Sequence, residues 1–189
     1  MDAAGGARGA FSGGASRGRR GRCGIRAARW VYTACGGHGY RNVGTGGGQA
    51  CGHLHFFRYP AVFLHAGDAL HGGLGIVGET DVAIAVSKSG RTAETLQVVD
   101  ALACACVPVI ALTGTPDSPL AEAADAVLDA SVTAEACPLG VSATASSTVA
   151  LTMGHALAMA LAAQRGWSLR DLARAHPAGA LGRATREER

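Results

Sequence analysis

Asp81-Val-Ala-Ile-Ala-Val86 runs directly into Ser87-Lys-Ser-Gly-Arg-Thr-Ala-Glu94, and this stretch decides the fold. A short β-branched run, followed by Ser, Gly and Thr and then by a helical pattern, predicts a strand, a tight turn and a helix. Such a turn brings hydroxyl groups and free backbone N–H groups to a helix N-terminus, which attracts anions. A single Ser or Thr there would be an ordinary helix cap. Because the turn is richer than a cap requires, the candidate phosphate-binding residues are Ser87, Ser89, Gly90 and Thr92.

The chain after residue 59 repeats this alternation of strand and helix. Strands are predicted over 59–65, 82–87, 107–113 and 126–129, and helices over 67–71, 92–106, 120–124 and 146–164. Alternating elements of this kind predict an α/β fold with a parallel sheet. Ligands of such sheets bind at the carboxyl ends of the strands, where Ser87 and Thr113 lie.

The 189 residues suit one domain, but the first 58 differ from the rest in composition. Residues 1–58 contain nine Arg, one acidic residue and 16 of the 28 Gly, whereas residues 59–189 contain eight basic and 13 acidic residues. Gly-rich segments lose the most entropy on ordering, and we find no apolar periodicity before about residue 59. We therefore divide the chain into a segment 1–58, predicted to be disordered, and a domain 59–189. The first strand and first helix of the sheet are expected to be missing or disrupted.

Four motifs follow one another along the chain. They read F-L-H-A-G-D-A-L-H-G-G-L-G over 63–75, S-K-S-G-R-T-A-E over 87–94, E-A-C-P-L-G-V-S-A-T-A-S-S-T over 135–148 and H-P-A-G-A-L-G-R over 176–183. Together they resemble the sugar isomerase (SIS) family, and within it the arabinose-5-phosphate isomerases. The last two motifs are nearly diagnostic of that subfamily. The resemblance covers residues 61–183 and implies a doubly wound α/β sandwich.

The resemblance also implies a reaction, the interconversion of D-arabinose 5-phosphate and D-ribulose 5-phosphate through an enediol without metal or organic cofactor. This chemistry needs a base, an acid for the oxygens and a clamp on the phosphate. Family residues associated with catalysis match Glu94, Glu135 and His176, with His71 as a lesser candidate. The second side of the clamp is assigned to Ser146, Ser147 and Thr148, at the start of the long helix.

Each candidate catalytic residue also has a local interpretation. Glu94 falls early in its helix, where a carboxylate is favourable without any further role. Glu135 precedes Pro138 in an apolar loop, where desolvation is expected to raise its pKa toward acid–base use. His176 precedes a proline in an extended turn, which favours a functional role over core packing.

Three departures from the family pattern bear on activity. A family Lys in the first turn has no counterpart, and Asn42 stands in its place by spacing. In the phosphate loop Asn becomes Lys88 and Glu becomes Arg91, and the H-G-D motif becomes H-G-G over 71–73. The family's paired CBS domains have no counterpart in the 189 residues. We therefore predict impaired isomerase activity, because the added cations help to hold phosphate without replacing a Lys on another strand.

Two other functions remain open. A non-catalytic sugar-phosphate sensor or regulatory domain would use Lys88 and Arg91 with the retained hydroxyls for binding without turnover, although no helix-turn-helix pattern accompanies it. An isomerase of another phosphosugar, such as a hexose phosphate, is the third possibility, and the Glu135 and His176 motifs argue against it.

Residues 1–58 have three interpretations. An Arg- and Gly-rich, acid-poor segment fits an organelle transit peptide or a nucleic-acid-binding tail. We prefer a shifted reading frame in the coding DNA. One nucleotide later, the possible codons of residues 49–60 permit K-L-A-A-T-F-T-S-S-G-T-P, which resembles the family's first helix. Those of residues 35–41 permit V-V-V-T-G-I-G, which resembles its first strand and turn.

The expected partners are a small sugar phosphate and further copies of the chain. The apolar helix around 150–163 has few charges on any face, so a partner should cover it, and the resemblance implies a homotetramer. We find no run long enough for a membrane span or a secretory signal, and expect neither membrane nor nucleic acid as partner.

Cysteine usage indicates the cellular compartment. The six Cys residues lack a disulfide-scaffold spacing, which predicts a reducing cytoplasm. Five possible metal ligands cluster in the sequence, but their irregular spacing does not match a zinc site, so no metal is expected. They are Cys35, His38, Cys51, His53 and His55.

Overall fold

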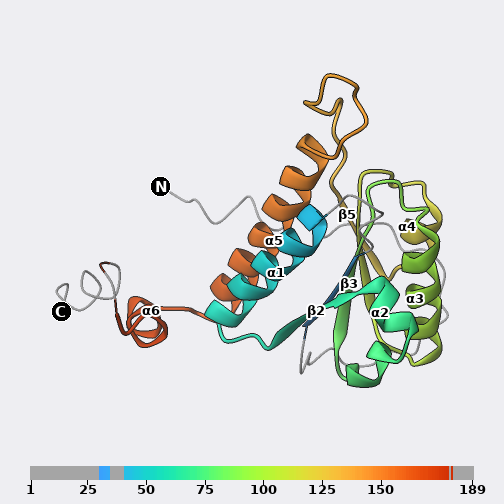
Figure 1. Cartoon of the computed structure of the whole chain (residues 1–189). Helices are drawn as coiled ribbons and strands as arrows, with labels where there is room; N and C mark the ends of the chain where they lie inside the picture. Colours follow the sequence, from blue (N-terminus) through green and yellow to red (C-terminus); the bar gives the residue numbers. More distant parts are fainter. Residues whose placement is uncertain (1–29, 35–40, 179, 181–189) are drawn as a thin grey trace.

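The computed structural model describes residues 30–34, 41–178 and 180, and its strands form one sheet (Figure 1). The strands are β1 (Trp30–Ala34), β2 (Ala61–His65), β3 (Val82–Val86), β4 (Val109–Thr113) and β5 (Ala126–Asp129). Their order is β2-β1-β3-β4-β5, and every neighbouring pair is parallel. The predicted α/β fold with a parallel sheet is confirmed.

Helices cover both faces of the sheet. α1 (Arg41–Phe56) and α5 (Ala145–Gln164) lie on one face, and α2 (Ala66–Leu70), α3 (Ala93–Cys104) and α4 (Pro119–Ala123) lie on the other (Figure 1). α6 (Leu169–Ala175) lies beyond the C-terminal end of α5 and begins with a capping box between Ser168 and Asp171. Every element predicted after residue 59 is present, within a few residues of the expected bounds.

The expectation that the first strand and helix are missing is wrong. β1 pairs with both β2 and β3, so it lies inside the sheet, and α1 joins it to β2. β1 shows no alternation in its sequence because both of its faces are buried: Trp30 and Tyr32 belong to one core cluster and Val31 to the other. The expected disorder of residues 1–29 and 35–40 lies outside the described residues.

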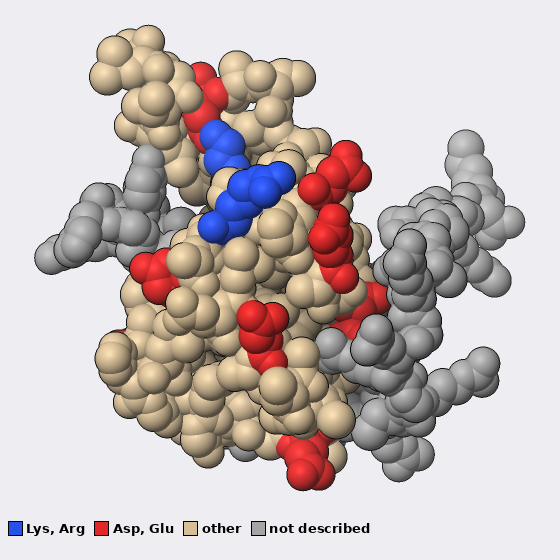
Figure 2. Space-filling model, turned by 90° about the vertical axis from the view of Figure 1, so that its right-hand side faces the viewer, with Lys and Arg blue, Asp and Glu red and all other residues tan. Residues whose placement is uncertain are grey.

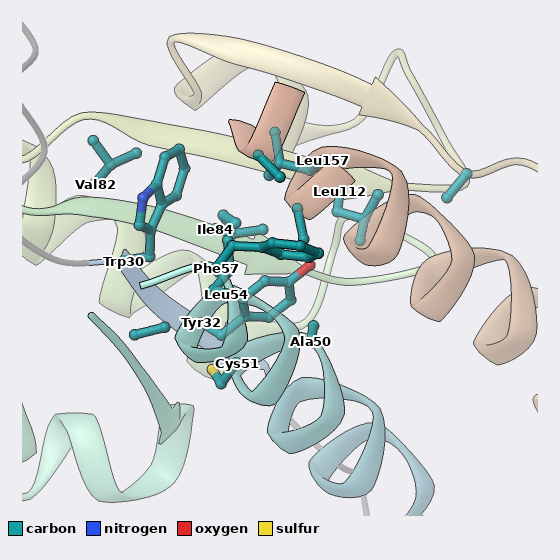
Figure 3. Packing of buried hydrophobic residues seen from close by; sticks show 14 residues of the cluster. Trp30, Tyr32, Ala50, Cys51, Leu54, Phe57, Val82, Ile84, Leu112 and Leu157 are labelled. Atoms are coloured by element: carbon teal, nitrogen blue, oxygen red, sulfur yellow. The ribbon is translucent and has the colours of Figure 1, made fainter. Parts of the chain in front are cut away.

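α1 forms despite an unfavourable composition. Five of its 16 residues are glycine, and a glycine in a helix interior costs about 0.5–1 kcal/mol relative to alanine. Tertiary packing offsets this cost, because Ala50, Cys51 and Leu54 are each at most 5% exposed. Figure 3 shows these side chains packed around Tyr32 on one face of the sheet.

The contact between α1 and α5 gives opposite predictions for two helical glycines. Gly48→Ala is expected to stabilise the fold by about 0.5–1 kcal/mol, because a Cβ there meets nothing within 4 Å. At Gly154 a Cβ would lie 2.7 Å from Oη of Tyr32 and 3.1 Å from Cβ of Ala50. Gly154→Ala is therefore expected to destabilise by about 1–3 kcal/mol through overpacking. Denaturant unfolding measures both, and stabilisation by Gly154→Ala would contradict the packing of α1 on α5.

α5 corrects the statement that no apolar run approaches the length of a membrane span. Over the described residues it is the one helix long and apolar enough to cross a membrane, with a mean hydropathy of 1.3 and 22% of the apolar window buried. Length and composition alone are weak evidence, because core helices of other proteins meet the same criterion. In this structure Leu157, Ala158 and Ala162 of α5 belong to the core.

Candidate functional site

The loop between β3 and α3 is held in shape by its own hydroxyl groups. Oγ of Ser87 and Oγ1 of Thr92 lie 2.9 Å apart, and the N–H of Gly90 donates to Ser87 Oγ at 3.1 Å. The N–H of Arg91 donates to Oγ of Ser89 at 3.2 Å. The predicted turn is therefore present, with its hydroxyls at the N-terminus of α3 and the carboxyl end of β3.

Gly90 allows this loop to lie directly against the start of α4. Its φ is +61°, and a Cβ there would lie 1.9 Å from Oγ of Ser118 and 3.1 Å from Oγ1 of Thr113. Ser118 is fully buried and caps α4 by accepting from the N–H of Ala121. The carbonyl of Gly90 accepts from the N–H of Leu120 at 3.1 Å. Only glycine meets both the left-handed backbone and the lack of space.

Lys88 has a fixed main chain and a free side chain. Its carbonyl accepts from the N–H of Gly114 at 3.0 Å and from the hydroxyls of Thr113 and Thr115 at 3.3 and 3.2 Å. Its side chain is 52% exposed, and Nζ lies 2.5 Å from Oε1 of Glu135. The ion pair thus joins the loop after β3 to the segment before α5.

Glu135 is buried among hydrogen-bond donors. Its side chain is 1% exposed, and Oε2 accepts from the N–H and hydroxyl of Thr144 at 2.9 and 3.1 Å and from the N–H of Ser146 at 3.2 Å. The Lys88 ammonium first, and then the Ser146 and Thr144 donors, hold the pKa of Glu135 well below its usual range. The expected rise by desolvation is wrong, because these donors outweigh the effect of burial.

The two cations of this loop stand out against an acidic background. Lys88 and Arg91 are the only Lys or Arg residues between positions 59 and 164, a stretch with ten Asp and Glu residues. Figure 2 shows a single group of cationic side chains on this face, with acidic side chains around it. Such a group makes the local potential favourable for an anion.

The hydroxyls assigned to the second side of the clamp have partners within their own helix. Ser147 Oγ donates to the carbonyls of Ala143 and Thr144 at 3.3 and 2.9 Å, and Thr148 Oγ1 donates to the Thr144 carbonyl at 2.9 Å. Ser146 is buried, and its main chain binds Glu135. Of the three residues, Ser146 therefore lies at the candidate site, whereas the hydroxyl protons of the other two are engaged with the backbone.

Two other candidates are exposed and outside the hydrogen bonds around Glu135. Glu94 lies in the first turn of α3, close in sequence to the phosphate loop. His71 caps the C-terminal end of α2, where its N–H donates to the carbonyl of Asp68. Neither position is brought into contact with Lys88 or Glu135 by the hydrogen bonds described above.

His176 lies far from Glu135 within the chain. Glu135 binds the N-terminal end of α5, whereas His176 follows α6, beyond the other end of α5 (Figure 1). α5 has 20 residues, a length of about 30 Å for an α-helix. The His176 ring packs edge-on against Phe56, with ring centroids 4.8 Å apart. A single chain therefore does not bring His176 to the other candidates.

The His and Cys cluster does not form a metal site in the described part of the chain. No group of three or more His, Cys, Asp or Glu side chains is arranged there to hold a metal ion. Burial raises the pKa of the Cys51 thiol to about 11, which disfavours the thiolate that binds metals. Cys35 and His38 lie outside the described residues.

Sequence reasoning missed two features of the site. It assigned Lys88 to phosphate alone, although the structure pairs it with Glu135, and it gave no role to Ser118, against which Gly90 packs. The available signal was composition, because an isolated lysine in an acidic stretch is expected to find a carboxylate partner. Which carboxylate it meets depends on the path of residues 130–145.

Comparison with known proteins adds a family and close relatives. The family model described as "SIS domain" matches residues 43–160. The arabinose 5-phosphate isomerase KdsD of Pseudomonas aeruginosa is 47% identical over 124 residues, 66% of this chain and 38% of that protein. KdsD of Escherichia coli strain K12 is 48% identical over 124 residues with the same coverage. The chain thus spans about 38% of the length of these relatives.

The fold is also found in a solved structure with a bound sugar phosphate. That structure, a protein of Escherichia coli strain CFT073 in complex with its sugar-phosphate ligand, has a TM-score of 0.71 and 30% sequence identity. The match covers 78% of this chain and 77% of that chain. The α/β architecture is therefore that of proteins with this domain.

Proposed function

Because this chain belongs to the SIS domain family, we propose that it binds a pentose 5-phosphate and interconverts D-arabinose 5-phosphate and D-ribulose 5-phosphate. The observation that carries this proposal is the convergence of the cationic, hydroxyl-rich loop 87–92 with a buried carboxylate, Glu135. The loop would hold the phosphate, and the carboxylate would lie beside the sugar. No metal or organic cofactor is required for the reaction.

The proposed chemistry moves one proton between adjacent carbons. A base removes the proton from C2 of the aldose, an enediol forms, and C1 then receives a proton to give the ketose. Glu135 is the proposed base, because its surroundings keep it ionised and it is therefore able to accept a proton. Glu94 and His71 are proposed to take lesser parts near the loop.

We propose that turnover by this chain is slow. The family's turn Lys has no counterpart, and a carboxylate that already accepts four hydrogen bonds is a weak base. The same observation favours the second candidate, a sugar-phosphate sensor that binds without turnover. Calorimetry with arabinose 5-phosphate and a coupled assay for ribulose 5-phosphate separate the two: binding with no detectable turnover supports the sensor.

Phosphate binding is predicted to depend on the exposed hydroxyl of the loop. Ser89→Ala is expected to weaken arabinose 5-phosphate binding by about 1–2 kcal/mol, the scale of a charge-assisted hydrogen bond. Thr152→Ala is the control, because Thr152 lies in α5 and its hydroxyl donates to the carbonyl of Thr148. Calorimetry measures both, and unchanged affinity in Ser89→Ala would argue against this loop as the phosphate site.

We further propose a cytoplasmic homo-oligomer, a tetramer by family resemblance. Apolar side chains remain exposed on α5 and on the loop before it, with Met159 at 45%, Val141 at 71% and Leu139 at 82%. Contact with a second copy would bury this surface. It would also allow His176 of one copy to reach the Glu135 of another.

This arrangement predicts complementation between inactive variants. Glu135→Gln and His176→Ala are each expected to lose activity alone, whereas a mixture refolded together is expected to regain activity at about one site in four by random assembly. Light scattering measures the oligomeric state at the same time. A monodisperse monomer, or no recovery in mixed oligomers, would contradict a site shared between copies.

A further inference from the structure

Lys88 and Glu135 differ sharply in their freedom to move. Glu135 is 1% exposed and its Oε2 is anchored by three donors at the start of α5, whereas the Lys88 side chain is 52% exposed. The main chain of Lys88 is held by three hydrogen bonds to its carbonyl. A change of partner in this pair would therefore be a swing of the lysine side chain alone.

Lys88 also belongs to the loop proposed to bind phosphate. It stands between Ser87 and Ser89, whose hydroxyls shape the loop, and it is the only lysine in the chain. A phosphate group carries a charge of about −1.5 to −2 at pH 7, compared with −1 for a carboxylate. An ammonium group within reach of both is drawn toward the phosphate.

We propose that Lys88 exchanges partners during binding: it holds Glu135 in the empty site and moves to the phosphate when a sugar phosphate arrives, which frees Oε1 of Glu135. This inference rests on the proposed function and adds a positioning residue to it. Substrate binding would then release the base in the same step. The empty site, in contrast, would keep the carboxylate engaged.

The exchange would also adjust the base at the moment of use. Lys88 is the foremost cause of the lowered pKa of Glu135, so its departure would let that pKa rise toward the ordinary range. Within the described residues, Lys88 is the ionisable group in hydrogen-bond contact with Glu135, and the other contacts are from Thr144 and Ser146. A carboxylate with a less depressed pKa is a stronger base.

A double-mutant cycle on affinity tests the exchange. Glu135→Gln removes the resting partner of Lys88, so arabinose 5-phosphate is expected to bind about 5-fold more tightly, the upper value for an ion pair with one exposed partner. In the Lys88→Met background the same Glu135→Gln change is expected to leave the affinity nearly unchanged. Inorganic phosphate is the second probe, and it should show the same pattern because it lacks the sugar.

The single lysine provides an independent measurement. In protein labelled at lysine, one side-chain NMR signal reports on Lys88, and it should differ between the unaltered protein and Glu135→Gln. With saturating arabinose 5-phosphate at pH 7 the two signals are expected to converge. This readout needs only the unaltered chain if Glu135→Gln does not fold, because a shift toward a free or phosphate-bound signal on ligand addition is then decisive.

The outcomes separate this inference from the proposed function. Binding by calorimetry with an unmoved Lys88 signal, or equal effects of Glu135→Gln with and without Lys88, would overturn the exchange and leave sugar-phosphate binding intact. No binding of either probe would overturn the proposed function itself, and the exchange with it.

Discussion

Gly90→Ala is expected to destabilise the protein by about 2–5 kcal/mol and to abolish sugar-phosphate binding. The added Cβ would lie 1.9 Å from Oγ and 2.4 Å from Cβ of Ser118, distances that require the main chain to move. Ser118 cannot withdraw easily, because it is buried and caps α4. The loop 87–92 would therefore shift as a whole. Thermal unfolding and calorimetry measure the two losses.

Gly166→Ala is the matched control for this prediction. Gly166 has φ +68°, close to the +61° of Gly90, but a Cβ there meets nothing within 4 Å. It should show only the cost of a left-handed alanine, about 1–2 kcal/mol, with binding unchanged. Adding Ser118→Gly to Gly90→Ala is expected to recover part of the stability. Equal losses in Gly90→Ala and Gly166→Ala would mean that the contact with Ser118 does not constrain the loop.

Glu135→Gln is expected to lower the rate of isomerisation by about 10²-fold or more while sugar-phosphate binding is retained. The amide keeps the shape of the side chain and some of its hydrogen bonds to Thr144 and Ser146, but it cannot accept the proton from C2. The loss should therefore appear in kcat rather than in the dissociation constant. A coupled ribulose 5-phosphate assay with calorimetry on the same protein separates the two quantities.

Glu79→Gln serves as the control, because Glu79 is exposed and lies before β3. It should leave both rate and affinity unchanged. A Glu135→Gln protein that folds and turns over at the rate of the unaltered chain would remove Glu135 from the reaction. In that case the carboxylate would act only as a cap for α5 and a partner for Lys88.

Local pattern was sufficient for most of the fold. The segments 82–87 and 92–106 were predictable as a strand and a helix because each contains its own periodicity and its own turn signal. The same holds for α5, whose apolar run and preceding hydroxyls mark its start. These features depend on residues close in sequence, so the order of elements and the parallel sheet follow from them.

β1 and α1 could not be predicted in this way. β1 has five residues and both faces buried, so it lacks alternation, and α1 contains five glycines that lower its intrinsic helicity. Both elements depend on partners far along the chain, β2 and β3 for the strand and α5 for the helix. Their stability comes from packing, which propensity does not describe.

The candidate site divides along the same line. The sequence by itself determined the chemistry available, namely the hydroxyls and cations of 87–92 and the carboxylate of Glu135, because side-chain identity is local. Only the tertiary structure decided which groups meet: Lys88 with Glu135, Gly90 with Ser118, and His176 with Phe56. Each of these contacts joins different loops or helices, and the protonation of Glu135 follows from them because a pKa depends on neighbours in space.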